Sequence, residues 1–342
     1  MKKSSTKQGE LSLIAEPTQG APTDSEALAA QVLSDFLADE SGGGPDAAAG
    51  SSPAQADLFV VMETVHDWPI KDDVSTMEFP IFSLSKKPDT QIRTYSRAGK
   101  TVRVIPSALG AATLFDKDLL IYCISHIVKA ADAGMKVGRR LKLSSHPFLV
   151  STKRSTGGTA YEGIVDMCRR LKGTTIETNV KTNEQERIEG FGLIEDYKVT
   201  QYTKNGKGAL ELEVTLSDWL YRAAIASDIL TLHPGYFSLG QALERRLYEL
   251  GRKHCGQQAW FCISLPLLQE KAGSVQEARY FKQEIKGILK VNRLPDFKLY
   301  LDTSTKPNQL VYVTRDSRKL MLEATQKGRI DWLAGLLQQR LA

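Results

Sequence analysis

One stretch near the end of the chain combines cationic and amide side chains at helical spacing. A helix expected from Val275 to Leu289 buries an apolar stripe formed by Ala278, Phe281, Ile285 and Ile288. A different face carries Arg279, Lys282, Gln283, Lys286 and Lys290. Cations neutralise phosphates, and Arg, Lys and Gln can hydrogen-bond to base edges, so this face favours contact with a DNA major groove. The alternative is a basic helix face that is merely solvated.

The elements around this helix favour the DNA interpretation. A strand at 261–265 and a short helix at 266–272 precede it, with a turn at Gly273-Ser274, and strands at 297–301 and 309–313 follow. Strand, helix, turn, helix and hairpin in this order are typical of a winged helix-turn-helix. The helix therefore occupies the recognition position. Base contacts are expected from Arg279, Lys282, Gln283 and Lys286, and further DNA contacts from Ser274, Lys290, Arg293, Lys298, Thr305 and Lys306.

The same order of elements occurs earlier, from Asp116 to Leu216, with a hairpin across Asn205-Gly206. Its candidate recognition helix, 159–171, exposes Glu162 and Asp166, and such acids repel phosphate. We expect this first copy to read bases poorly and to contact phosphates or a second protomer instead. The cationic candidates there are Lys153, Arg154, Arg169, Arg170, Lys204 and Lys207.

The chain has 342 residues, enough for two domains with their own cores. Residues 1–57 hold three Lys and nine Asp or Glu, a net charge of −6, whereas the remainder carries +11. The fold class expected is α+β: two tandem winged-helix domains, 58–228 and 229–342 with C-terminal helices, preceded by a disordered acidic tail. Within the tail, 25–39 has the pattern of a short amphipathic helix.

Residues that could support catalysis are not grouped in the sequence. The five His lack HxH or HExxH spacing, and the four Cys lack CxxC spacing. Gly157-Gly158 and 206–208 do not match a phosphate-binding loop, and Asp72-Asp73 is expected to lie in a loop. We therefore expect no enzyme activity, no cofactor and no metal. Neither a secretory signal nor a membrane-spanning run is recognisable, which favours a cytoplasmic protein.

Three blocks resemble the plasmid replication initiator protein A family. They are Pro69–Thr90 (PIKDDVSTMEFPIFSLSKKPDT), Asp116–Ile124 (DKDLLIYCI) and Leu265–Ser274 (LPLLQEKAGS). The resemblance covers roughly Leu58 to Arg315 and omits the tail. It implies a bacterial plasmid protein that binds repeated origin sequences (iterons), helps to open the duplex and recruits host helicase or initiator proteins. It also agrees with two winged helices and with self-association, and it implies association with the bacterial nucleoid or with plasmid DNA.

The resulting hypothesis is a non-enzymatic initiator that binds double-stranded origin DNA. A transcriptional regulator with the same domains, including an autorepressor, is the main alternative. A nickase or relaxase and a scaffold that binds no DNA are weaker alternatives.

Overall fold

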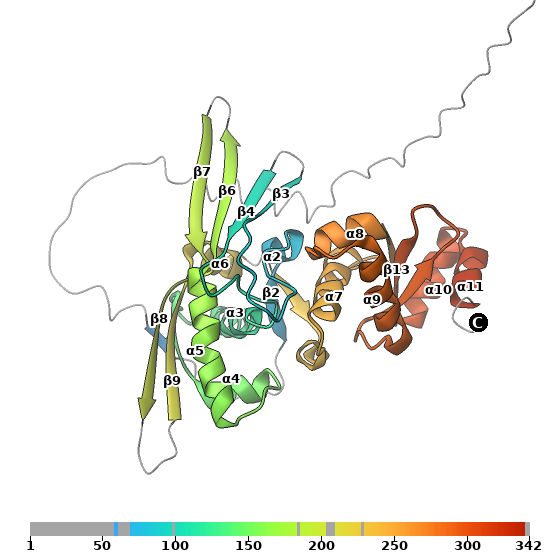
Figure 1. The fold of residues 1–342 in the computed structure, drawn as a ribbon. Helices are drawn as coiled ribbons and strands as arrows, with labels where there is room; N and C mark the ends of the chain where they lie inside the picture. The colour runs from blue at the N-terminus through green and yellow to red at the C-terminus, as the bar shows by residue number, and fades with distance from the viewer. Residues whose placement is uncertain are drawn as a thin grey trace, which may run out of the picture.

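A computed structural model describes residues 58–60, 69–97, 100–182, 185–202, 209–226 and 229–338 (Figure 1). The expected tail, with its amphipathic segment at 25–39, lies outside the described residues. So do Lys204 and Lys207. None of the helices in the described ranges has both the length and the apolar character needed to cross a bilayer.

The first half of the chain is built around one helix, α3, which is buried on nearly all sides. Leu119, Leu120, Cys123 and Ile124 are essentially inaccessible to solvent, so α3 is the centre of the larger hydrophobic cluster. The elements are β1 (Leu58–Val60), β2 (Ile70–Asp73), α2 (Val74–Glu78), β3 (Arg93–Arg97), β4 (Lys100–Ile105), α3 (Lys117–Asp132), β5 (Arg140–Ser144), α4 (Ser145–Ser151), α5 (Gly158–Gly173), β6 (Thr175–Thr182), β7 (Gln185–Gly192), β8 (Ile194–Tyr202), β9 (Ala209–Leu216) and α6 (Asp218–Ile225).

Two sheets flank this helical core. One has the order β1-β5-β9-β8, with the last three strands antiparallel, and the other has the order β3-β4-β6-β7. In Figure 1, the second sheet projects above α3, while α5 runs beside β8 and β9. The hairpin β6–β7 is inserted between α5 and β8, so the order helix, strand, helix, helix, hairpin is kept around it.

The second half repeats that order. Helix α7 is followed by β11, α8, α9 and the hairpin β12–β13, and the sheet order β11-β13-β12 matches β5-β9-β8 of the first half. The elements are β10 (Ile229–Leu232), η2 (Pro234–Ser238), α7 (Ala242–His254), β11 (Trp260–Ser264), α8 (Leu265–Ala272), α9 (Ala278–Val291), β12 (Phe297–Asp302), β13 (Gln309–Thr314), α10 (Ser317–Gln326) and α11 (Ile330–Gln338).

The C-terminal helices α10 and α11 pack against one face of the sheet β11-β13-β12. Leu336 is buried beside Val311 and Val313, and Trp332 lies 5.6 Å from Trp260 between ring centroids. The apolar C-terminal segment of the sequence predicts that Trp332, Leu336 and Leu337 pack back onto a domain. This is correct for Trp332 and Leu336, whereas Leu337 is exposed.

Two antiparallel strands connect the halves, since β10 pairs with β2 from Ile229↔Asp73 to Leu232↔Ile70. A second hydrophobic cluster belongs mainly to residues after 228, but Met77 and Ile121 contribute to it. Strand pairing and hydrophobic contacts therefore join residues on either side of the expected domain boundary between residues 228 and 229. That boundary stays a prediction.

The sequence favours strands at 79–83 and 190–202, a helix capped by Asp116 and a helix that begins at Ser238, and the structure differs from each of these expectations. Residues 79–83 form no strand: Pro80 has no N–H to donate, and Ser83 makes only an isolated bridge to Thr113. Residues 190–192 belong to β7 rather than to β8, because the chain turns sharply at Gly192. At Gly192 a Cβ would lie 2.9 Å from the Ile194 carbonyl oxygen.

The start of two helices also differs from expectation. Residues 238–241 precede α7 instead of opening it. Asp116 occupies the N-cap position of α3, but its side chain accepts hydrogen bonds from the Thr113 N–H and from Arg170 rather than from the helix. Asp72-Asp73 ends strand β2 rather than lying in a loop; Asp73 caps α2 by accepting from the Thr76 N–H.

Candidate nucleic-acid interface

Helix α9 is held rigidly by its apolar side and by both ends. Phe281, Ile285 and Ile288 are buried in the second cluster. The preceding turn needs Gly273, whose φ is +73° and where a Cβ would lie 2.6 Å from Pro80. At the other end, the Asn292 amide donates to the Leu299 carbonyl oxygen and accepts from the Leu299 N–H, at 2.7 and 2.9 Å. The face of α9 opposite the core is therefore presented in a fixed orientation.

The exposed face of α9 carries most of the predicted DNA contacts. Arg279, Gln283, Lys286 and Lys290 are exposed at spacings of four, three and four residues, which places them on one stripe. Lys282 lies beside this stripe and is half-buried. Among the described residues, Lys282, Lys286 and Lys290 form no ion pair. Their charges are therefore available to a ligand.

Arg279 differs from these lysines because it already has local partners. Its Nε lies 2.8 Å from a Glu277 carboxylate oxygen, and its guanidinium lies 4.4 Å from the centroid of the Tyr280 ring. Both partners are exposed. An exposed ion pair of this kind stabilises little, so it can be exchanged for a phosphate or a base.

Other residues of this half that are predicted to contact DNA lie on the hairpin β12–β13 or in the turn before α9. Lys298 and Lys306 are exposed, and Thr305 is half-buried with its hydroxyl 3.2 Å from the Pro307 carbonyl oxygen. Ser274 is half-buried in the turn before α9, where its N–H donates to the Gln269 carbonyl oxygen.

Arg293 is bound within the protein. Its Nε and Nη2 donate to the two carboxylate oxygens of Glu244 at 2.9 and 2.5 Å, and this hydrogen bonding raises the pKa of Arg293. Glu244 is buried, so withdrawing Arg293 toward a phosphate would leave a buried carboxylate without its partner. The structure therefore argues against the predicted phosphate contact.

In the first half, the arginines predicted to contact DNA are paired with acidic side chains of the protein itself. Arg170 makes two hydrogen bonds of 2.7 Å to buried Asp116, and Arg154 donates to buried Asp118 at 2.8 Å. The predicted phosphate contacts by these two arginines conflict with this geometry, because both guanidiniums are committed to buried carboxylates. Arg169 is exposed but pairs with Asp166 at 3.0 Å.

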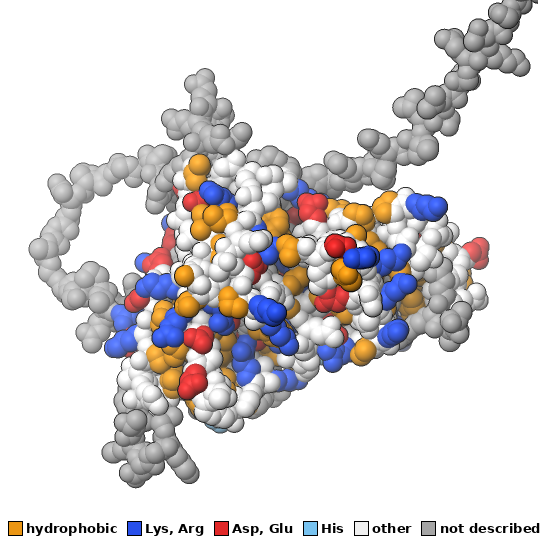
Figure 2. Space-filling view, in the orientation of Figure 1, with side chains coloured by type: hydrophobic (Ala, Val, Ile, Leu, Met, Phe, Trp, Pro, Cys, Tyr) orange, Lys and Arg blue, Asp and Glu red, His pale blue; other side chains and the backbone are white. Residues whose placement is uncertain are grey.

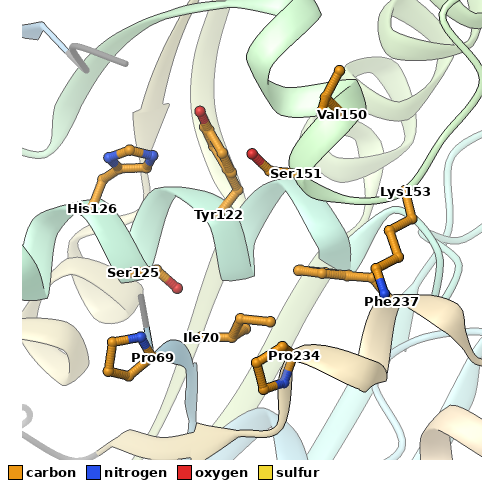
Figure 3. A pocket seen from close by; sticks show the side chains of 10 residues that line it. All are labelled: Pro69, Ile70, Tyr122, Ser125, His126, Val150, Ser151, Lys153, Pro234 and Phe237. Atoms are coloured by element: carbon orange, nitrogen blue, oxygen red, sulfur yellow. The ribbon is translucent and has the colours of Figure 1, made fainter. Parts of the chain in front are cut away.

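Lys153 lies at a small cavity between α3, α4 and η2 (Figure 3). Its amine donates to the Ser238 hydroxyl at 2.7 Å and so connects the two halves. The cavity has a volume of about 100 Å³, below the roughly 300–1,000 Å³ typical of small-molecule sites. It is lined by Pro69, Ile70, Tyr122, Ser125, His126, Val150, Ser151, Lys153, Pro234 and Phe237.

A buried ionic network joins α3 to α7 and was missed by the sequence analysis. The Lys117 amine lies 2.6 Å from Asp72 and 3.2 Å from Glu249, and Arg245 binds Asp118 at 2.5 Å. Burial lowers the pKa of Lys117, but the two carboxylates outweigh burial and raise it. The signal that the sequence offered was the charged pair Lys117-Asp118 at the start of a helix whose next residues are mostly apolar.

A second ionic contact between the halves centres on Glu78 of α2. Its carboxylate binds Lys253 and lies 3.4 Å from Lys271. Burial alone would raise the pKa of Glu78, but these two lysines lower it to about 2. Removing one partner of a buried ion pair costs several kcal/mol of stability, so these ion pairs favour one arrangement of the first and second halves of the chain.

The space-filling view shows Lys and Arg side chains over both halves, interspersed with acids (Figure 2). Cations alone therefore do not distinguish the two halves on this face. The distinguishing feature is how the candidate cations are paired: Arg154 and Arg170 of the first half bind buried carboxylates, whereas Lys282, Lys286 and Lys290 of α9 form no ion pair among the described residues and Arg279 pairs only with the exposed Glu277.

A family model and one related protein both match most of the folded part of this chain. The family model described as "Replication initiator protein A" matches residues 71–299. A protein of Wigglesworthia glossinidia brevipalpis, described as "Putative replication protein", is 35% identical over 243 residues, which cover 70% of this chain and 88% of the relative.

Two solved structures, both of domains 2 and 3 of RctB, share the fold. One has a TM-score of 0.55 and covers 68% of this chain and 94% of its own; the other has a TM-score of 0.50 and covers 72% and 99%. Both are 14% identical in sequence, so the likeness concerns the fold alone. Two thirds of the chain match one family model, and the relative supports that match along most of its own length. The chain belongs to the replication initiator protein A family.

Proposed function

We propose that the chain initiates plasmid replication by binding repeated origin DNA through two winged-helix domains, without catalysing a reaction itself. The observation that carries the proposal is the exposed basic stripe of α9, whose lysines form no ion pair within the described part of the chain, presented by a chain of this family. The repeated order of helix, strand, helix, helix and hairpin, with matching sheet orders, supports the winged-helix assignment.

In this proposal α9 lies in the major groove and reads sequence. Arg279, Gln283 and Lys286 contact base edges, Lys282 and Lys290 flank them, and Lys298 and Lys306 hold phosphates from the hairpin side. The first half supports the complex through the DNA backbone or through a second protomer. Origin opening and recruitment of host helicase or initiator proteins belong to the same proposal and rest on family membership.

The test is footprinting on DNA that flanks the chain's own gene, followed by affinity measurements on the protected site. Lys282→Ala combined with Lys286→Ala should cost about 1–3 kcal/mol for each base interaction that the substitutions remove, and should reduce the salt dependence of binding. A matched control is Lys136→Ala with Arg318→Ala, which removes two exposed cations outside α9 and both hairpins. Equal affinity of the two double variants would contradict the assignment of α9.

A transcriptional regulator would use the same surface, so DNA affinity cannot separate the two functions. A genetic measurement can: a plasmid carrying only this gene and its neighbouring repeats should replicate. Incubation with supercoiled DNA and Mg²⁺ tests the non-enzymatic part of the proposal, because a nicked product would contradict it.

A further inference from the structure

Helix α9 contains a glycine that its own fold does not require. Gly287 is the tenth of its fourteen residues, is exposed, and would have no atom within 4 Å of an added Cβ. Its φ is not in the positive region, so an alanine could adopt the same backbone. A glycine inside a helix costs about 1 kcal/mol relative to alanine. Packing within the described protein offers nothing in return for this cost.

The missing side chain lies in the middle of an exposed surface, which we call the α9 patch: Tyr280, Gln283, Gly287, Lys290 and Val291. Tyr280 and Val291 are 50% and 62% exposed. Helical spacing places Gln283 and Val291 one turn before and after Gly287, and Tyr280 two turns before it. The patch shares Gln283 and Lys290 with the basic stripe and extends from it on the side away from Lys282. It therefore combines an amide, two apolar side chains and a cation around a point without a side chain.

This combination suits base edges better than phosphates. A glutamine amide can bond an adenine edge, and apolar side chains can contact a thymine methyl group. A helix with its side chains is about 10–12 Å wide and the major groove is about 12 Å wide, so there is little spare room. A side chain at the point of closest approach would hold the helix away from the bases.

We infer that base pairs of the target DNA approach α9 most closely at Gly287, and that the absence of a side chain there is a determinant of sequence-specific binding. The inference rests on the proposed function and deepens it: the base-reading surface extends from Gln283 to Gly287 and Tyr280, beyond the lysines. The helix gives up stability at this position so that the DNA can come close.

The experiment compares two alanine substitutions at exposed helix glycines. Gly287→Ala and Gly335→Ala both add a methyl group where no atom lies within 4 Å. Each should raise the unfolding midpoint by about 2 °C. On a duplex carrying the footprinted site, Gly287→Ala should weaken binding about tenfold, whereas Gly335→Ala in α11 should leave it unchanged. On a duplex of unrelated sequence, both variants should bind like the parent chain, because the phosphate contacts remain.

Three outcomes separate the possibilities. If Gly287→Ala binds the footprinted site normally while Lys282→Ala with Lys286→Ala weakens binding, the inference fails and the proposed function stands. If the lysine variant also binds normally, both fail. If Gly287→Ala weakens binding equally for both duplexes, close approach to bases is wrong, and the added methyl group disturbs backbone contacts instead.

Discussion

Helices α5 and α9 occupy the same place in the two halves but expose opposite chemistry. The three buried residues of α9, Phe281, Ile285 and Ile288, have the same spacing as Ile164, Cys168 and Leu171 in α5, which buries Met167 in addition. With these aligned, the exposed positions of Arg279 and Gln283 correspond to Glu162 and Asp166.

The cations of the two helices also differ in what binds them. In α5, Arg170 turns to buried Asp116, and Arg169 pairs with Asp166. In α9, the position corresponding to Arg170 is Gly287, and Lys286 and Lys290 have no ion-pair partner within the described chain. A shared pattern of buried residues therefore does not determine whether the exposed face of a helix can bind DNA. What separates a structural helix from a DNA-reading candidate is whether its cations are already neutralised by the protein.

The strongest test converts the exposed face of α9 into that of α5. Arg279→Glu with Gln283→Asp should weaken binding to the footprinted site by about 3 kcal/mol or more, which is over a hundredfold, because two base-reading side chains are removed and two acids face the DNA. The free energy of unfolding should change by no more than about 0.5 kcal/mol, since both positions are exposed. Fluorescence anisotropy and urea titration measure the two quantities. Retention of affinity would remove α9 from the interface.

The second test asks whether the first half's arginines are structural. Arg170→Ala should destabilise the protein by about 2 kcal/mol because buried Asp116 loses two hydrogen bonds; the partial exposure of Arg170 reduces the cost below that of a fully buried pair. Arg169→Ala is the matched control, since both members of its pair with Asp166 are about half exposed. It should cost at most about 0.5 kcal/mol. If instead Arg170→Ala preserves stability and weakens DNA binding, the arginine is a phosphate contact after all.

A third test uses two histidines on the corresponding helices α3 and α7. Burial lowers the pKa of His126 to about 3, and burial together with Lys271 and Lys253 lowers the pKa of His254 to about 3. Unfolding restores a pKa near 6.5, so the unfolded state binds more protons and stability is lost as the pH falls from 6.5 toward 3. At pH 5 each histidine should cost about 2 kcal/mol.

Urea unfolding at pH 7.5 and pH 5 checks this expectation. Glu78, whose pKa is about 2 in the folded state, contributes a pH dependence only below about 4.5 and does not interfere. Asp72, whose pKa burial raises to about 8, titrates in the same window with the opposite sign, so each histidine is judged from its own variant. Replacing one histidine by glutamine should reduce the loss of stability between the two pH values by about 2 kcal/mol relative to the parent chain. A glutamine variant with the same pH dependence as the parent chain would show that the replaced histidine keeps an ordinary pKa in the folded protein.

The sequence predicted those features that depend on residues close together in the chain. The helical period correctly predicted that Phe281, Ile285 and Ile288 are buried, although Ala278, expected to join them, is exposed. The helix runs from Ala278 to Val291 rather than from Val275 to Leu289. The pairing of Arg154 with Asp118 and of Arg170 with Asp116 joins residues 36 and 54 positions apart. Such partners become visible only when the helices pack, so all exposed-looking cations in the first half were treated alike. The hairpin β6–β7 and its attachment to β4 were missed for the same reason, because β6 must pair with the distant strand β4.

The smallest expected effect comes from the reverse conversion, which gives α5 the chemistry of α9. Glu162→Arg with Asp166→Gln removes two exposed acids and releases Arg169 from its ion pair. Binding to DNA of unrelated sequence should tighten about threefold to tenfold at low salt, with a steeper salt dependence, because added cations displace more counterions. Affinity for the footprinted site relative to unrelated DNA should fall, since the gain carries no sequence information.

A control with the same change in net charge is Asp331→Arg with Asp132→Gln, at two exposed positions outside both helices. If this control tightens binding as much as the α5 variant, the effect is one of overall charge and α5 does not lie near the DNA. If only the α5 variant tightens binding, α5 faces the duplex and its acids are what limit contact. In that case the two halves differ in the charge on one helix face rather than in their position relative to the DNA.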